Sequence, residues 1–191
     1  ANTIFKNLVV VRPEKNQGFL LNCNLAATHA KGRYIMLLNN DTLVNENWLE
    51  SLFNLMEQDE NIAISGSKLV YPDGKLQEAG GIIWQDGSGW NYGRMSQPGN
   101  PEYNYVKEVD YISGASILLR TSFWLEVDGF DDRYVPAYYE DTDLAFEASS
   151  RGYKVVYHPH SVVVHFEGRS HGTDANVGIK AYQVENQKKF N

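Results

Sequence analysis

Asp41 closes the first long apolar run of the chain, and its neighbours are also polar. The run covers residues 34–38, and the side chains of Asn39, Asn40, Asp41 and Thr42 follow it. A carboxylate beside amide and hydroxyl oxygens suits a hard divalent cation that itself holds phosphate oxygens. The alternative is a turn in which the Asn and Asp side chains satisfy backbone groups. This short segment alone leaves both interpretations open.

The densest acidic cluster opens a predicted helix later in the chain. It consists of Tyr138, Tyr139, Glu140, Asp141, Thr142 and Asp143. Carboxylates in a first helical turn meet exposed amides and the positive end of the helix dipole, and that structural role is our prediction for Asp143. Asp141 follows two tyrosines, which is typical of a cleft mouth. A general base must lie within hydrogen-bonding reach of the hydroxyl that it deprotonates, and Asp141 is the candidate.

His165 ends a β-branched run, residues 161–165, much as Asp41 ends the earlier one. A neutral imidazole at a strand end is a reasonable partner for a metal ion. A lone histidine is more often a core or hydrogen-bonding residue, so this alternative also stays open at the level of the sequence.

The composition is that of an ordinary globular domain. The chain has 191 residues, 42% of them hydrophobic and 21% charged, and its net charge is −7. Neither disorder nor a membrane span is expected, because no apolar run approaches about 18 residues. The acidic balance argues against a nucleic-acid partner held by a general basic surface. Cys23 is the single cysteine, which excludes an intrachain disulfide and is compatible with a reducing compartment. Residues 1–7 lack the apolar core of a signal peptide.

Hydrophobic spacing predicts alternating strands and helices around these residues. The run 34–38 is predicted to be a strand buried on both faces of a mainly parallel sheet, with Asp41 beyond its carboxyl end. Strands are also predicted at 8–11, 62–65, 116–119, 153–158 and 161–165, and helices at 18–29, 48–56, 122–127, 140–151 and the polar C-terminus. Strand 8–11, helix 18–29 and strand 34–38 would form a right-handed β-α-β unit. Residues 75–105 contain Trp84 and Trp90 among many glycines, which indicates an irregular loop or hairpin.

Several motifs together resemble those of inverting glycosyltransferases of family 2, in the rhamnosyltransferase-like, polysaccharide-biosynthesis branch. The motifs are Asn16-Gln17-Gly18-Phe19 with Asn24, Leu38-Asn39-Asn40-Asp41-Thr42, Val127-Asp128-Gly129-Phe130-Asp131, Tyr139-Glu140-Asp141-Thr142-Asp143-Leu144, and Gly152 to Pro159 followed by His165. The second resembles a relaxed D-x-D element in which the last acid is retained. Asn39 stands in place of an acid there, which lowers the local negative charge.

The resemblance implies an α/β fold of the GT-A type. Its open, mostly parallel (mixed) sheet would be flanked by helices, in a single domain over residues 1–191. The family's first strand and helix, and the segment that reads the nucleobase, would lie upstream of Ala1, so the resemblance implies an incomplete, N-terminally truncated domain.

The resemblance also implies roles for individual residues. Asp141 would be the catalytic base. Asp41 and His165 would hold Mg²⁺ or Mn²⁺ on a nucleotide-sugar donor. Donor binding would further involve Asn16, Gly18, Asn39 and Asn40. Substrate contacts would come from Gly114, Ala115, Glu140, Tyr139, Trp84 and Trp90.

The implied reaction transfers a sugar to a glycan or lipid-linked glycan hydroxyl in cell-surface polysaccharide synthesis. The expected location is the cytoplasm, including the inner face of the cell membrane, with peripheral association and no nucleic-acid partner. Two alternatives remain at this level: a nucleotidyltransferase, and a glycan-binding fragment without catalysis.

Overall fold

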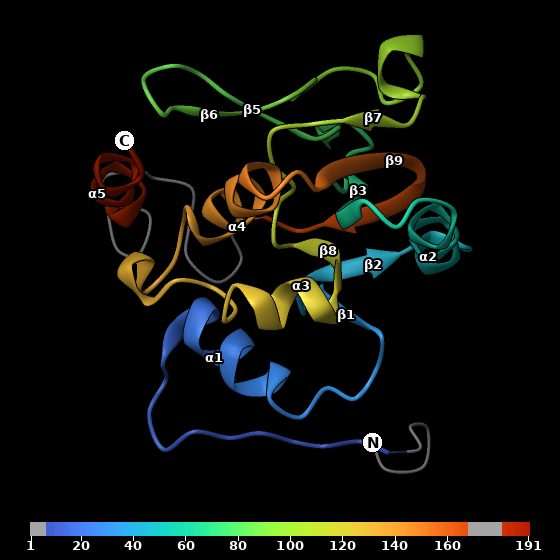
Figure 1. Ribbon diagram of the computed structural model, residues 1–191. Coiled ribbons are helices and arrows are strands. Elements are labelled where there is room, and N and C mark those ends of the chain that lie inside the picture. The colour runs from blue at the N-terminus through green and yellow to red at the C-terminus, as the bar shows by residue number, and fades with distance from the viewer. Residues whose placement is uncertain (1–6, 168–180) are drawn as a thin grey trace.

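The computed structural model describes residues 7–167 and 181–191, whose elements are arranged as in Figure 1. The helices are α1 (Gly18–Ala27), α2 (Trp48–Gln58), α3 (Thr121–Glu126), α4 (Glu140–Ser150) and α5 (Ala181–Phe190). The strands are β1 (Tyr34–Leu38), β2 (Thr42–Val44), β3 (Ile62–Val70), β4 (Leu76–Glu78), β5 (Gly81–Ile83), β6 (Gly89–Asn91), β7 (Lys107–Glu108), β8 (Ser116–Arg120) and β9 (Lys154–His165). Short 3₁₀ turns cover Pro101–Tyr103 and Asp132–Tyr134. None of the described helices has the length and apolar character of a membrane span.

A seven-stranded mixed sheet organises the chain, with the strand order β1-β8-β3-β9-β2, β4 beside β3 and β7 beside β9. The expected mixed sheet with flanking helices is confirmed. Its parallel share is smaller than expected, because β3 and β9 form the parallel pair and the other named pairs are antiparallel. The reason is the position of β8. Strands β1 and β3 run in the same direction, but β8 lies between them and is antiparallel to both.

The two faces of the sheet are covered by different helices. Alternating side chains on β8 show the division, since successive residues of a strand point to opposite faces. Leu118 packs in one cluster with Leu52 and Met56 of α2. Ile117 and Leu119 belong to the larger cluster, which also holds buried residues of α1, α3 and α4. Figure 1 shows α1 below α3 at the foot of the molecule and α2 at its right-hand edge.

The chain turns after β3, returns to it as β4, and leaves the main sheet with residues 81–91. The turn after β3 is closed by a hydrogen bond from the Gly74 N–H to the Tyr71 carbonyl at 2.9 Å. Strands β5 and β6 then pair as an antiparallel hairpin at the top of Figure 1. Trp84 and Trp90 lie on this hairpin with 52% and 59% of their surfaces exposed. The expected hairpin excursion is confirmed.

The prediction of a strand at residues 8–11 is wrong. Val9 and Val10 are 61% and 62% exposed, and no described strand pairs with them. A β-branched run needs a partner ladder to become a strand, and β1 pairs with β8 instead. The expected β-α-β unit is therefore absent from the described residues.

Two further strand predictions need correction. β1 is an edge strand of the described sheet, and Leu38 at its end is 41% exposed, so β1 is not buried on both faces. The predicted strands 153–158 and 161–165 are one strand, β9, which continues through Pro159. A register shift opposite Ser67 and Lys68 of β3 absorbs the irregularity at the proline.

Candidate functional site

One central cavity of about 750 Å³ collects most of the predicted site residues. Its walls come from α1, the end of β1, β4, the turn before β8, the start of α4 and the end of β9. The predicted residues that line it are Asn16, Gly18, Asn39, Asn40, Asp41, Gly114, Ala115, Tyr139, Glu140, Asp141 and His165. Segments more than a hundred residues apart in the sequence therefore meet at this cavity.

Asp41 and His165 form a close pair in the cavity wall. The Oδ1 atom of Asp41 lies 3.4 Å from Nε2 of His165. The backbone fixes this approach, because Thr42 of β2 stands opposite His165 of β9 and the Phe166 N–H donates to the Asp41 carbonyl at 2.9 Å. Asn39 is held too, since its N–H donates to the carbonyl of Ala115 at 3.0 Å.

His165 is oriented from its other ring nitrogen. Its Nδ1 lies 3.2 Å from Oε1 of Gln77, and the Gln77 amide nitrogen donates to Glu167 at 3.1 Å. Glu167 also accepts hydrogen bonds from Tyr71 and Arg94. Burial lowers the pKa of His165, although the nearby Asp41 carboxylate opposes this shift. The imidazole is therefore neutral at pH 7, which is the form that binds metal ions.

The donor set fits a divalent cation. A carboxylate oxygen and a neutral imidazole nitrogen lie next to each other. Two neighbouring ligands of an octahedral ion with bonds of about 2.1 Å lie about 3.0 Å apart. The observed 3.4 Å is close to that spacing. Among the described residues no group of three or more His, Cys, Asp and Glu side chains could hold a metal by itself. The pair thus suits an ion that takes its remaining ligands from a substrate and water.

Asp141 stands at the first turn of α4 with both carboxylate oxygens engaged. Oδ2 accepts a hydrogen bond from the Gly114 N–H at 2.9 Å, and Oδ1 accepts one from the Thr142 N–H at 2.8 Å. Burial raises the pKa of Asp141 above its ordinary value, while these hydrogen bonds act in the opposite direction. A carboxylate with a raised pKa is a stronger base, which is what proton abstraction from a hydroxyl requires.

Two further carboxyl groups line the cavity close to Asp141. Glu140 is 5% exposed, and burial together with the Asp141 charge raises its pKa. Glu78 on β4 is 1% exposed, and burial raises its pKa to about 8. Sequence reasoning missed Glu78, Gln77 and Glu167. The one available signal was a pair of polar residues in a short strand after the turn at residues 72–74.

The start of α4 is held in an unusual backbone conformation. Tyr138 and Tyr139 have φ values of 75° and 73°, a region that non-glycine residues rarely adopt. The Tyr139 hydroxyl donates to the Gly87 carbonyl at 2.8 Å, and its ring packs against Phe190 of α5. With only 7% of its surface exposed, the Tyr139 side chain fixes the helix start and faces away from open solvent.

Asn186 of α5 secures the segment that precedes α4. Its side-chain nitrogen donates to the carbonyls of Tyr134, Ala137 and Tyr138 at 2.8, 2.9 and 2.9 Å. Asn186 is fully buried. Sequence reasoning treated the C-terminal helix only as a polar element, and nothing local marked this residue as a clamp.

The N-terminal side of the cavity is built by α1. The Asn16 side chain accepts a hydrogen bond from the Gly18 N–H at 3.0 Å, which turns the chain into the helix. Gly18 has a φ of +79°, and a Cβ atom there would lie 2.8 Å from the Pro136 carbonyl oxygen. Asn24 then exchanges two hydrogen bonds with the backbone of Phe130, which ties the Gly-Phe-Asp segment to α1.

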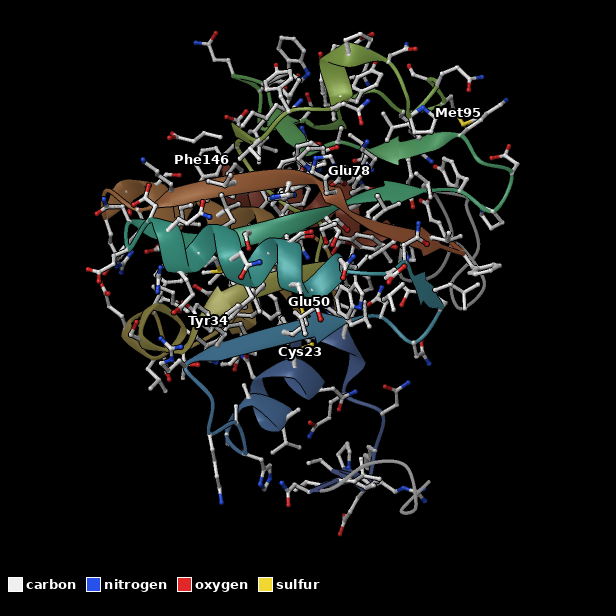
Figure 2. The ribbon with its side chains drawn as sticks, turned by 90° about the vertical axis from the view of Figure 1, so that its right-hand side faces the viewer. Cys23, Tyr34, Glu50, Glu78, Met95 and Phe146 are labelled. Atoms are coloured by element: carbon white, nitrogen blue, oxygen red, sulfur yellow. The ribbon has the colours of Figure 1, made fainter. Side chains whose placement is uncertain are left out.

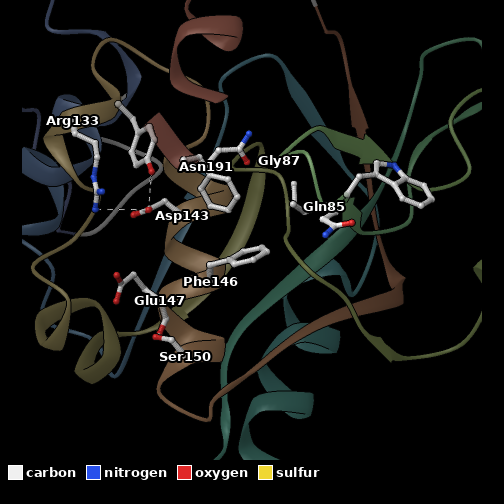
Figure 3. A pocket seen from close by; sticks show the side chains of 12 residues that line it. Gln85, Gly87, Arg133, Asp143, Phe146, Glu147, Ser150 and Asn191 are labelled. Carbon is white, nitrogen blue, oxygen red and sulfur yellow. Dashed lines mark hydrogen bonds and ion pairs between the residues drawn. The ribbon is translucent and has the colours of Figure 1, made fainter. Parts of the chain in front are cut away.

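Trp84 and Trp90 do not line the central cavity. Their ring centroids are 6.2 Å apart on the exposed hairpin. Trp84 borders a second hollow of about 630 Å³ between the hairpin, α4 and α5. Figure 3 shows Phe146, Glu147 and Ser150 of α4 along one side of this hollow and Gln85 and Gly87 of the hairpin on the other. The structure therefore separates the two tryptophans from the Asp41, Asp141 and His165 side chains.

Comparison with known proteins identifies the family. The family model described as Glycosyl transferase family 2 matches residues 1–125. The chain belongs to glycosyl transferase family 2. This family 2 chain is 30% identical over 162 residues to the O-antigen biosynthesis protein RfbC of Myxococcus xanthus, a match that covers 80% of the chain and 12% of the relative. It is 38% identical over 76 residues to an N-acetylglucosaminyl-diphospho-decaprenol L-rhamnosyltransferase of Mycobacterium tuberculosis, covering 40% of the chain and 24% of the relative.

Solved structures of glycosyltransferases share the fold of this family 2 chain, which is GT-A. GalNAc-T7 with UDP, GalNAc and Mn²⁺ superimposes with a TM-score of 0.65 at 17% identity, over 82% of this chain and 32% of that one. The mannosyltransferase PcManGT of Pyrobaculum calidifontis, in complex with GDP-Man and Mn²⁺, gives 0.57 at 13% identity, over 85% and 40%. The family 2 chain spans less than a third of the length of the curated relatives named here.

Proposed function

We propose that this chain is a single glycosyltransferase domain that transfers a sugar, with inversion and with the help of a divalent cation, from a nucleotide-sugar to a glycan hydroxyl. The observation that carries the proposal is the shared cavity. It presents a basic carboxylate, Asp141, and a metal-ligand pair, Asp41 with His165, to the same space. In a sugar transfer between two oxygen atoms, a base can take the proton of the attacking hydroxyl while a metal ion stabilises the leaving diphosphate.

In the proposed reaction the acceptor oxygen attacks the anomeric carbon from the side opposite the nucleotide. The new carbon–oxygen bond forms as the bond to the diphosphate breaks, and the diphosphate leaves with the electron pair. Asp141 takes the proton of the attacking hydroxyl. The Gly114 N–H holds the Asp141 carboxylate in position, and Glu140 orients the acceptor. Gly114 and Ala115 form the floor beneath the sugars, and Asn16, Gly18, Asn39 and Asn40 contact the nucleotide.

Asp41 and His165 are the proposed ligands of Mg²⁺ or Mn²⁺. A bound divalent cation offsets the negative charge that builds up on the departing diphosphate. The small number of basic side chains in the cavity supports this assignment. Carboxyl groups of Asp41, Glu78, Glu140, Asp141 and Glu167 line it, whereas Arg94 is the one lysine or arginine among its described lining residues. An anionic diphosphate therefore needs a further positive charge in order to bind.

The relatives support a cell-surface glycan as the product. One is named for O-antigen biosynthesis, and the mycobacterial relative is named for a sugar transferred to a diphospho-decaprenol acceptor. We infer that the acceptor here is a glycan or a lipid-linked glycan. The proposed place of reaction is the cytoplasmic side of the membrane, where the domain would associate with the membrane surface.

Turnover of nucleotide-sugars tests the proposal directly. The chain, and a longer protein that contains it, are incubated with Mn²⁺, a lipid-linked acceptor and UDP-glucose, UDP-GalNAc or GDP-mannose, and nucleoside diphosphate release is measured. Asp141→Asn is expected to lower kcat by about 10²–10⁴-fold, the usual contribution of a general base. Asp143→Asn is the matched control, because Asp143 bonds to Tyr134 and does not line the central cavity. Undiminished turnover by Asp141→Asn contradicts the base assignment.

Calorimetry separates the transferase from a binding module. Binding of UDP or GDP that requires Mn²⁺ and is abolished by a chelator supports the transferase. Binding of oligosaccharides that is indifferent to the chelator supports a non-catalytic glycan-binding fragment instead.

A further inference from the structure

Glu78 is the buried group of the cavity that the proposed reaction leaves without a task. Figure 2 places it among the strands in the middle of the molecule, where it ends β4 opposite Leu69 of β3. The residue is 1% exposed and lines the central cavity. Burying a carboxyl group lowers the stability of the fold unless a hydrogen-bonding partner compensates, and such groups are often found at functional sites.

One oxygen of Glu78 is occupied and the other is not. Oε1 accepts a hydrogen bond from the Ser113 N–H at 3.1 Å. Oε2 is buried, and no described residue is a hydrogen-bonding partner for it. Buried polar atoms are nearly always paired, so an unpaired oxygen in the wall of a ligand cavity marks a position that a ligand atom completes.

The surroundings of Glu78 define what that ligand atom is. Ser113 precedes Gly114, whose N–H holds Asp141, so the Ser113–Gly114 turn joins Glu78 to the catalytic base. Burial and the charges of Asp141 and Glu167 favour the protonated form of Glu78, and its pKa rises to about 8. A protonated carboxyl group both donates and accepts hydrogen bonds, which matches a sugar hydroxyl better than a phosphate oxygen.

We propose that Oε2 of Glu78 binds a hydroxyl group of one of the two sugars that meet at Asp141 and thereby contributes to sugar specificity. This inference rests on the proposed glycosyltransferase function. It assigns Glu78 a direct contact with substrate, and it accounts for the one carboxyl oxygen, Oε2, that bonds to no described residue. The donor sugar and the acceptor sugar offer the same chemistry, and the experiment distinguishes them.

Glu78→Gln is the test variant, because an amide keeps the shape and the bond from Ser113 but removes the carboxyl group. Binding of UDP-glucose, UDP-GalNAc and GDP-mannose with Mn²⁺ is measured by calorimetry, and KM for donor and acceptor is measured by turnover. The expected result is a rise of about tenfold in Kd or KM for one of the two sugars. If Kd and KM rise for the donor, Glu78 contacts the donor sugar. If only KM for the acceptor rises, Glu78 contacts the acceptor sugar.

The melting temperature Tm distinguishes a substrate-binding role of Glu78 from a structural role, because the two roles predict changes in Tm of opposite sign. If Glu78 is kept for substrate, Glu78→Gln is expected to raise Tm at pH 7 by about 5 °C, because the free protein no longer buries an ionisable group. A lower Tm, or failure to fold, identifies a structural carboxyl and overturns the inference. Ser65→Ala is the matched control, since Ser65 Oγ, like Glu78 Oε2, is buried without a partner among the described residues but lies outside the cavity.

The two proposals fail in different ways. If the wild-type protein binds none of the three donors, the proposed function and this inference are both overturned. If Asp141→Asn loses turnover as expected but Glu78→Gln keeps an unchanged Kd and KM for every substrate, the role of Glu78 is overturned. The proposed transferase function then still stands.

Discussion

The backbone N–H of Gly114 donates a hydrogen bond to Oδ2 of Asp141 at 2.9 Å. Gly114 belongs to the turn that leads into β8, and Asp141 belongs to the first turn of α4, so this bond joins the sheet to the helix at the cavity. A Cβ atom on residue 114 would lie 3.1 Å from the Phe19 ring. The bond and the close packing together fix the direction of the carboxylate before any substrate binds.

The acid limb of the pH–rate profile reports on Asp141. The carboxylate works as a base only when it is deprotonated, so kcat is expected to fall as the pH drops through the raised pKa of Asp141. The limb should lie clearly above the ordinary carboxyl value of 3.8. Asp143→Asn serves as the control and should keep the same limb. A profile that is flat down to about pH 4 would rule out Asp141 as the base.

Stability should decrease with rising pH because of Glu78. Its pKa rises from 4.5 to about 8 on folding, so the native state binds the proton more tightly between these values. The contribution of Glu78 to the free energy of unfolding is therefore highest below pH 4.5. It declines as the pH rises to 8, by as much as about 5 kcal/mol. Urea titrations between pH 5 and 8 measure the slope. Glu78→Gln should flatten it, and an unchanged slope would show that another group is responsible.

Metal affinity should depend on His165 and not on its strand neighbour His158. His165→Ala removes one of two ligand atoms in the Asp41 pair, and Mn²⁺ binding in the presence of UDP is expected to weaken about 10- to 100-fold. Protonation of the imidazole competes with the metal, so wild-type affinity should also fall at acidic pH. His158→Ala changes a residue outside the cavity and should bind Mn²⁺ normally. Calorimetry decides, and equal losses in both variants would refute the assignment.

Asn186→Ala should destabilise the fold by about 3 kcal/mol. It removes the two amide protons that the carbonyls of Tyr134, Ala137 and Tyr138 share, in a fully buried place. Gln187→Ala is the matched control, because the neighbouring side chain makes one exposed bond to Asp86 and should cost less than about 0.5 kcal/mol. Chemical denaturation compares the two. Similar losses would mean that the clamp contributes little.

Trp84→Ala and Trp90→Ala should leave donor binding unchanged within about twofold, because neither side chain lines the central cavity. Their exposed rings on the hairpin suit stacking with a long acceptor, so KM for a polysaccharide acceptor is expected to rise about fivefold. Calorimetry with the donor and initial rates with the acceptor separate the two effects. Weaker donor binding in either variant would place the hairpin closer to the nucleotide than the structure does.

The sequence predicted the position of a site residue where that position depends on neighbouring residues in the chain. Asp41 follows an apolar strand, His165 ends one, and Asp141 lies in the first turn of a helix, so residue type and neighbours predicted their places. The structure brings all three to one cavity. That shared cavity depends on chain topology, which local patterns do not contain. Their chemical roles remain predictions.

Other features depend on distant partners. The run 8–11 has strand-forming residues but no ladder to join, and the direction of β8 follows from where the chain returns after a long excursion. Glu78 and Gln77 sit in a three-residue strand that is placed by its pairing with β3. Asn186 gains its importance from carbonyls about fifty residues earlier. No periodicity in the sequence reports on such contacts.

The pairing of Thr42 with His165 limits how the length of this chain can vary. One residue inserted into or deleted from β2 or the last part of β9 would shift the ladder and turn the imidazole to the opposite face of the sheet. Asp41 would then lose its neighbour although every other residue was kept. Homologous sequences should therefore tolerate insertions at the tip of the β5–β6 hairpin, residues 84–88, and show a constant length from β2's first residue to its last and from residue 161 to residue 165.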